Sequence, residues 1–147
     1  MHNLKTIEKL LKNELSATET YQQALDKFRE DVELGDSEHL MPIYEQHKEA
    51  VASLQSLTSR LGGTPAETSG VWGTWAKIIL GGANMIGKEA VLKTLLEGEK
   101  SGLADYQEVL QDTELLPDIR SLVEPKLLSA QQAHIDTLAR LLDAATA

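Results

Sequence analysis

Apolar residues recur at spacings of three and four along four long segments of this chain, and this periodicity restricts the fold more than any other feature. The segments cover about residues 3–29, 37–61, 86–111 and 118–145. Ala, Leu, Glu, Lys and Gln dominate the composition, and these residues favour helices over strands. With 147 residues the chain has the length of one domain. We therefore expect an all-α, left-handed four-helix bundle that forms a single domain over residues 1–147.

The connections between the segments predict the path of the chain. Two of them are short, at about residues 31–37 and 112–117, and they flank a long one at about 62–86. Short connections make consecutive helices antiparallel neighbours, whereas the long one can cross from one end of the bundle to the other. The pattern predicts an up-down-down-up path with a short helix, Val71–Leu80, in the crossover. Pro125 should kink the first part of the fourth helix.

Composition and charge exclude several classes of function. The net charge is −9, which disfavours binding to a phosphate backbone, so no nucleic-acid partner is expected. The chain has no cysteine, which excludes disulfides and thiolate metal sites. We see no secretory leader and no apolar run near the ~20 residues of a membrane span. A cytoplasmic location without membrane attachment is therefore expected.

One ionisable residue interrupts the apolar stripe of each predicted helix. These residues are Glu14, His47, Glu99 and His134. A lone buried charge is costly, and such groups are normally paired or bind metal. Because the interruptions match between the two halves of the chain, they favour one polar layer across the bundle over four unrelated exceptions.

The two halves of the chain repeat this pattern. Glu14 precedes Tyr21 by seven residues, and Glu99 precedes Tyr106 by seven, so each pair shares one helix face. Glu99 and His134 lie at equal distances from the second short turn. The midpoint between Glu14 and His47 in the sequence lies slightly before the first turn, which corresponds to an offset of ~4–5 Å along the helix axis. An early end of the first helix would remove this offset. Glu19 fits the level of His47 better but lies off the apolar stripe, so it ranks below Glu14.

This pattern resembles the ferritin-like superfamily, which includes bacterioferritin, rubrerythrin and the di-iron carboxylate oxidases. The resemblance covers the whole chain and is closest to small, uncharacterised bacterial ferritin-like domains of unknown function. The superfamily places a Glu on helices 1 and 3 and Glu-x-x-His on helices 2 and 4. Glu14 and Glu99 match the lone glutamates, and His47 and His134 match the histidines. The resemblance implies a metal site and a role in metal handling or stress response.

The chain departs from the superfamily pattern at two positions. Tyr44 and Gln131 stand where the Glu of each Glu-x-x-His motif is expected. A di-iron site needs hard oxygen ligands to neutralise two cations, so a di-iron oxidase is the weakest reading. Two Glu and two His still suit one iron, zinc or manganese ion. The expectation is a reduced, mononuclear site lined by Glu14, His47, Glu99 and His134, with no substrate identified.

Alternatives remain open at this point. The polar layer can be a metal-free relic whose hydrogen bonds specify helix register in a structural or interaction bundle. Tyr21 and Tyr106 are most simply core aromatics whose hydroxyls bond the layer. Trp72 and Trp75 lie in the short apolar helix, where they favour a homodimer contact or a cover for the bundle end over a membrane-interface helix.

Overall fold

The structure is a computed structural model, and it describes residues 2–30, 37–69 and 88–146. Over these ranges the chain is all-helical and contains no strand. The helices are α1 (His2–Glu30), α2 (Ser37–Arg60), α4 (Lys88–Leu110), and a composite fourth helix of α5 (Pro117–Leu122), η1 (Val123–Leu128) and α6 (Ser129–Thr146). The expected all-α architecture of four long helices is confirmed, and the predicted boundaries agree within a few residues.

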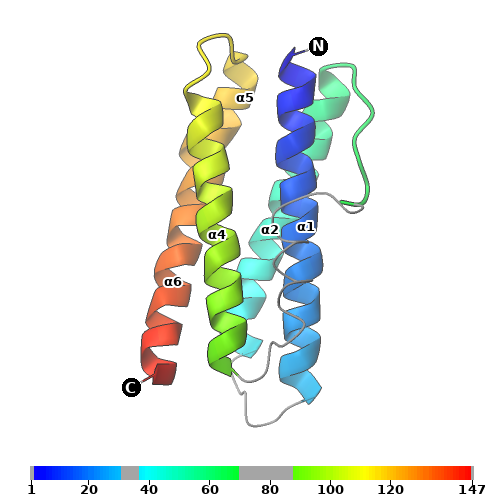
Figure 1. Ribbon diagram of the computed structural model, residues 1–147. Coiled ribbons are helices and arrows are strands. Elements are labelled where there is room, and N and C mark those ends of the chain that lie inside the picture. Colours follow the sequence, from blue (N-terminus) through cyan, green and yellow to red (C-terminus); the bar gives the residue numbers. More distant parts are fainter. Residues whose placement is uncertain (1, 31–36, 70–87, 147) are drawn as a thin grey trace.

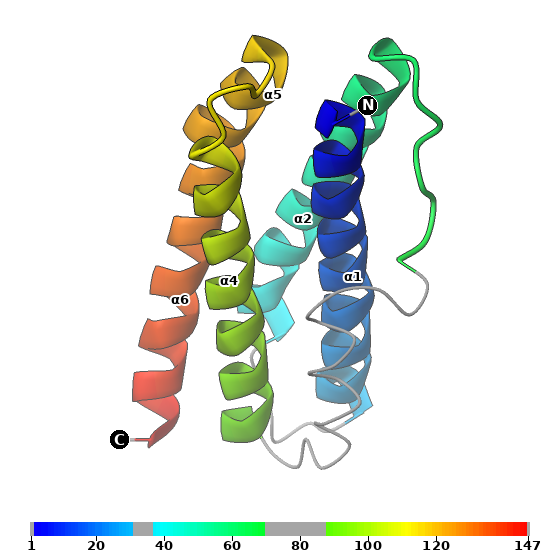
Figure 2. The ribbon, with the colours of Figure 1, turned by 45° about the horizontal axis from the view of Figure 1, so that its top comes forward.

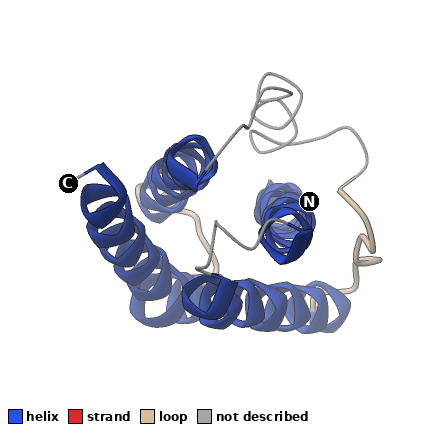
Figure 3. Cartoon of the chain, turned by 90° about the horizontal axis from the view of Figure 1, so that it is seen from below, coloured by secondary structure: helices blue, strands red, loops and turns tan. Residues whose placement is uncertain are grey.

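The helices associate as two pairs. α1 packs mainly on α2, and α4 packs mainly on α6. In Figure 1, α1 and α6 run downward while α2 and α4 run upward, so each pair is antiparallel. Figure 2 shows the same directions from a second angle, and Figure 3 shows the bundle from below, where α1 is seen nearly end-on and the helix that ends at the C-terminus runs obliquely across the view. The two pairs lie side by side, because α1 also packs on α4.

A glycine ends α2. Gly62 has a φ of 87°, a left-handed conformation that side chains disfavour. The Gly62 N–H donates to the Ser59 carbonyl, and the Gly63 N–H donates to the Thr58 carbonyl. These two hydrogen bonds form a Schellman motif, which satisfies carbonyl groups that the helix end would otherwise leave unpaired. Residues 64–69 then run back along α1 and α2, where Ser69 bonds to Glu19.

Pro125 lies within a π-helical segment, η1, in the middle of the fourth helix. Proline has no N–H to donate and its ring crowds the preceding turn, so an α-helix cannot continue unchanged through it. The sequence predicted a kink at this position. At this position the helix widens locally to a π-turn, and the backbone at Ser129 is again α-helical.

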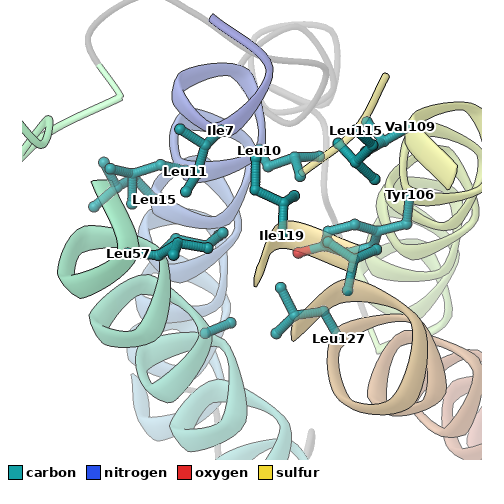
Figure 4. Close-up of a cluster of buried hydrophobic side chains, with 13 residues drawn as sticks. Ile7, Leu10, Leu11, Leu15, Leu57, Tyr106, Val109, Leu115, Ile119 and Leu127 are labelled. Carbon is teal, nitrogen blue, oxygen red and sulfur yellow. The ribbon is translucent and has the colours of Figure 1, made fainter. Parts of the chain in front are cut away.

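The apolar core is divided into two clusters. The cluster nearer the start of α1 draws on all four helices and is shown in Figure 4, with Leu10, Leu57, Tyr106 and Leu127 among its members. The other lies nearer the end of α1 and includes Leu25, Leu40, Leu92 and Leu138. On α2, α4 and the fourth helix the polar residue predicted from the sequence falls between the residues of the two clusters, and on α1 Glu14 lies next to Leu15, the last α1 residue of the first cluster. The polar layer therefore separates two apolar blocks.

Several expectations concern residues outside the described ranges. The short helix at Val71–Leu80, with Trp72 and Trp75, is one, and so is the dimer contact assigned to it. Among the residues that the structure describes, no helix is long and apolar enough to cross a membrane.

Candidate metal centre

The structure brings the four predicted layer residues together in the middle of the bundle. Glu14 (α1), His47 (α2), Glu99 (α4) and His134 (α6) are 4%, 1%, 0% and 4% exposed. His47 lies between the two carboxylates, and the imidazole ring of His134 is 4.8 Å from that of His47 between centroids. The level predicted for Glu14 is confirmed, since its carboxylate contacts His47 directly. Glu19 is exposed and bonds to Ser69 instead.

His47 is hydrogen-bonded at both ring nitrogens. Its Nδ1 is 2.5 Å from Glu14 Oε2, and its Nε2 is 2.5 Å from Glu99 Oε1. Carboxylate oxygens only accept hydrogen bonds, so both nitrogens carry a proton when both bonds form. Burial alone lowers the pKa of His47, but the charges of Glu99 and Glu14 outweigh burial and raise it to about 10. In the metal-free protein His47 is therefore an imidazolium ion.

The two tyrosines predicted to bond the layer do so, and each crosses to the other half of the repeat. The Tyr21 hydroxyl donates to Glu99 Oε1 at 2.9 Å, and the Tyr106 hydroxyl donates to Glu14 Oε1. Burial and the neighbouring carboxylates raise the pKa of both phenols well above its usual value, so both remain donors. The prediction that these are core aromatics bonded to the layer is confirmed.

Glu99 carries the densest set of contacts in the layer. Its Oε1 accepts from Tyr21 and His47 and lies 3.4 Å from His134 Nδ1. Burial raises the pKa of the carboxyl group, but the positive charge of His47 and the nearness of both histidine rings outweigh burial and lower it to about 2. Glu99 is therefore a carboxylate at neutral pH.

His134 is held differently from His47. Its Nε2 is 2.6 Å from the side-chain oxygen of Gln46, on α2. An amide oxygen only accepts, so the proton of this hydrogen bond lies on His134 Nε2. His134 Nδ1 and Glu99 Oε2 are buried atoms without a hydrogen-bond partner in the described part of the chain.

The two positions that depart from the superfamily pattern contribute no ligand to this layer. Tyr44 is half-buried, and its hydroxyl donates to Gln22 at the surface. Gln131 is buried, but its amide nitrogen donates to the Glu99 backbone carbonyl at 3.0 Å. Gly102 permits this pose, because a Cβ there would lie 2.6 Å from the Gln131 amide nitrogen.

Sequence reasoning missed Gln46. It precedes His47, lies off the apolar stripe and is exposed as a residue, so periodicity gives no sign that its side chain reaches across to α6. A glutamine next to a histidine on the apolar stripe does not by itself indicate a hydrogen bond to another helix. Only the packing of α2 beside α6 reveals the contact.

Three of the four residues form a group that could hold one cation. His47, Glu99 and His134 each offer a ligand atom, and these atoms lie within 4.8 Å of one another. Glu14 stands outside this group, on the opposite ring nitrogen of His47. Two imidazoles and one carboxylate suit zinc, iron(II) and manganese(II).

Fold and site together define a helical-bundle protein with a buried His–Glu–His cluster suited to a metal ion. The chain belongs to the family described as a domain of unknown function (DUF2383), which matches residues 2–112. That match ends before the fourth helix, so His134 lies outside it. No curated protein and no solved structure shows significant similarity to the chain. The family match itself makes no connection to the ferritin-like superfamily.

Proposed function

We propose that this protein is a ferritin-like bundle that binds a single divalent transition-metal ion through His47, Glu99 and His134, and that its role is metal handling. The observation that carries the proposal is that two buried atoms of this group, His134 Nδ1 and Glu99 Oε2, have no hydrogen-bond partner in the described part of the chain. A buried acceptor without a partner is destabilising. A cation between the two atoms would turn that cost into ligation.

The charge of the layer also favours one divalent ion. Glu14 and Glu99 contribute two negative charges, and the imidazolium of His47 balances only one of them. No lysine or arginine is among the buried residues of the described ranges. If a divalent ion takes the place of the His47 Nε2 proton, two positive charges meet two negative ones and the layer becomes neutral. Two divalent ions would leave it with an excess of two positive charges.

The surroundings of the three ligands resemble those of known metal sites in one further respect. Metal-bound histidines usually donate their second ring N–H to a carboxylate or carbonyl, which fixes the tautomer and the orientation. His47 Nδ1 has Glu14, and His134 Nε2 has Gln46. We therefore propose that Glu14, predicted from the sequence as a ligand, orients His47 instead.

The same residues argue against a di-iron oxidase. Tyr44 faces the surface, and Gln131 is committed to a backbone carbonyl, so neither supplies the second bridging oxygen that two ions need. When bound, one iron or manganese ion would supply redox chemistry and one zinc ion Lewis acidity. Storage, transport or buffering of a metal, or a part in the response to oxidative stress, is the corresponding role.

The proposal is tested by the metal content of the full chain, purified without an affinity tag or chelator and then loaded with Fe²⁺, Zn²⁺ or Mn²⁺. We expect about one ion per chain after removal of excess metal. His134→Ala and Glu99→Gln should lose it, because each removes one of three ligands. His39→Ala is the matched control, since His39 is exposed on α2 and should leave the metal content unchanged.

The alternative hypothesis is a bundle that binds no metal and in which the layer is an ionic hydrogen-bond network. The two short hydrogen bonds of His47 support it, because they satisfy both ring nitrogens without a metal. Absence of metal from the loaded wild-type chain would support it. Two ions per chain would instead support the di-iron reading.

A further inference from the structure

We propose that Gln46 is a positioning residue that makes His134 a metal ligand through Nδ1. The inference rests on the proposed function and deepens it, because it identifies the residue on which the ligand geometry depends. It concerns a contact between α2 and α6 that lies outside the apolar stripes and outside the set of candidate ligands.

The first step is the tautomer of His134. A neutral imidazole carries one proton, on either Nδ1 or Nε2. With the proton on Nδ1, the ring could donate toward Glu99, whose Oε1 is 3.4 Å away. With the proton on Nε2, it donates to Gln46 Oε1 at 2.6 Å, and the lone pair on Nδ1 faces Glu99. The shorter contact to an obligate acceptor selects the second tautomer.

The second step is what this tautomer does to the layer. In this tautomer the buried His134 Nδ1 has no proton to donate, and Glu99 Oε2, which is also buried, has no hydrogen-bond partner in the described part of the chain. Without Gln46 the ring could carry its proton on Nδ1 and donate to Glu99, and Nδ1 could then not bind a cation. Gln46 therefore keeps the metal-free layer in the arrangement that a cation completes.

The Gln46 side chain is a neutral acceptor, and this matters for the charge of the layer. An amide oxygen accepts the His134 proton without adding charge to a layer that already holds two carboxylates. A glutamate would also accept the proton, but it would place a third negative charge beside the ring. The neutral acceptor preserves the match between two carboxylates and one divalent ion.

The inference predicts a specific set of results for ¹⁵N-histidine NMR on the full, metal-free chain, with His134 assigned by loss of its signals in His134→Gln. In the wild type we expect His134 to carry its proton on Nε2. In Gln46→Leu we expect the proton to move to Nδ1. Gln46→Glu should retain the wild-type tautomer, because it retains an acceptor.

Zinc affinity, measured by competition with a chromophoric chelator, provides the second readout. Loss of an outer partner of a metal-bound histidine typically weakens binding ~10–100-fold, so we expect that loss in Gln46→Leu. Gln46→Glu should recover at least part of it. Gln107→Leu, an exposed glutamine on α4, is the matched control and should bind zinc like the wild type.

The outcomes separate this inference from the proposed function. An Nδ1-protonated His134 in the wild type, or an unchanged tautomer in Gln46→Leu, would overturn the role of Gln46 whether or not zinc binds. Wild-type zinc affinity in a folded Gln46→Leu would overturn it as well. If the wild type binds no zinc, the proposed function fails, and the NMR result alone decides what Gln46 does.

Discussion

At the scale of single residues, His47 determines the electrostatics of the layer. It lies between two carboxylates that would otherwise repel each other in a buried site, and both of its nitrogens are used. Its charge also accounts for the low pKa of Glu99. The metal-free protein is thus stabilised by an ion pair that a metal would have to replace.

The pKa shifts of His47 and Glu99 predict how the stability of the metal-free protein depends on pH. The pKa of His47 is raised from 6.5 to about 10, so its contribution is complete below about 6.5 and is lost as the pH rises through 10. The pKa of Glu99 is lowered from 4.5 to about 2, so its contribution is complete above 4.5 and is lost as the pH falls through 2. Stability should therefore be greatest between about 4.5 and 6.5.

Urea unfolding of the metal-free chain at a series of pH values measures this dependence. The control is the double variant His47→Gln with Glu99→Gln, which removes both charges. Its free energy of unfolding should lack the decrease that the wild type shows on the alkaline side. A wild type whose stability relative to the double variant does not fall between pH 6.5 and 10 would show that His47 is not the imidazolium described above.

The different positions of Glu14 and Glu99 lead to a second prediction at this scale. Glu99→Gln should abolish zinc binding, because it removes the only carboxylate ligand of the group. Glu14→Gln should weaken binding by only ~10–100-fold, because it removes the partner of His47 Nδ1 and no ligand. Chelator competition measures both, and equal loss in the two variants would make Glu14 a ligand, as the sequence suggested.

At the scale of helices, the sequence predicted most of what the structure contains. Spacings of three and four located all four helices, because this signal is local. The π-turn around Pro125 was not predicted. A proline inside a helix indicates that the regular hydrogen bonding is interrupted, but not how the backbone adapts. The reach of Gln46 was not predicted either, because it depends on how two helices distant in sequence pack together.

Gly62 provides a prediction for the stability of α2. Its φ of 87° is unfavourable for any residue with a Cβ, while a Cβ built there meets nothing within 4 Å. The cost of Gly62→Ala should therefore be conformational alone, about 1–2 kcal/mol in the free energy of unfolding. Chemical denaturation measures it against Ser56→Ala, an exposed change on the same helix. A cost near zero would mean that the Schellman motif at this end is not maintained.

At the scale of the whole molecule, the bundle consists of two apolar blocks joined through one ionic layer. A continuous apolar core would bury more hydrophobic surface and avoid the desolvation of two carboxylates and a histidine. The layer is therefore difficult to explain by stability alone. A binding role explains it more directly, and this reasoning can be tested without any metal.

An apolar layer should leave the metal-free bundle as stable as the wild type or more so, by as much as ~1–4 kcal/mol. The variant replaces the layer with leucine and the two tyrosines with phenylalanine: Glu14→Leu, His47→Leu, Glu99→Leu, His134→Leu, Tyr21→Phe and Tyr106→Phe. Thermal and urea unfolding compare it with the wild type after metal removal. A large loss of stability would favour the reading in which the layer exists to hold the bundle together.

The central claim is that one divalent ion binds between His47, Glu99 and His134. Anomalous diffraction from crystals of the full chain grown with Zn²⁺, recorded on both sides of the zinc absorption edge, tests it most directly. We expect one strong anomalous peak in the layer, bonded to His47 Nε2, His134 Nδ1 and the Glu99 carboxylate, with Glu14 on His47 Nδ1. A layer without a peak, or with two peaks, would contradict it.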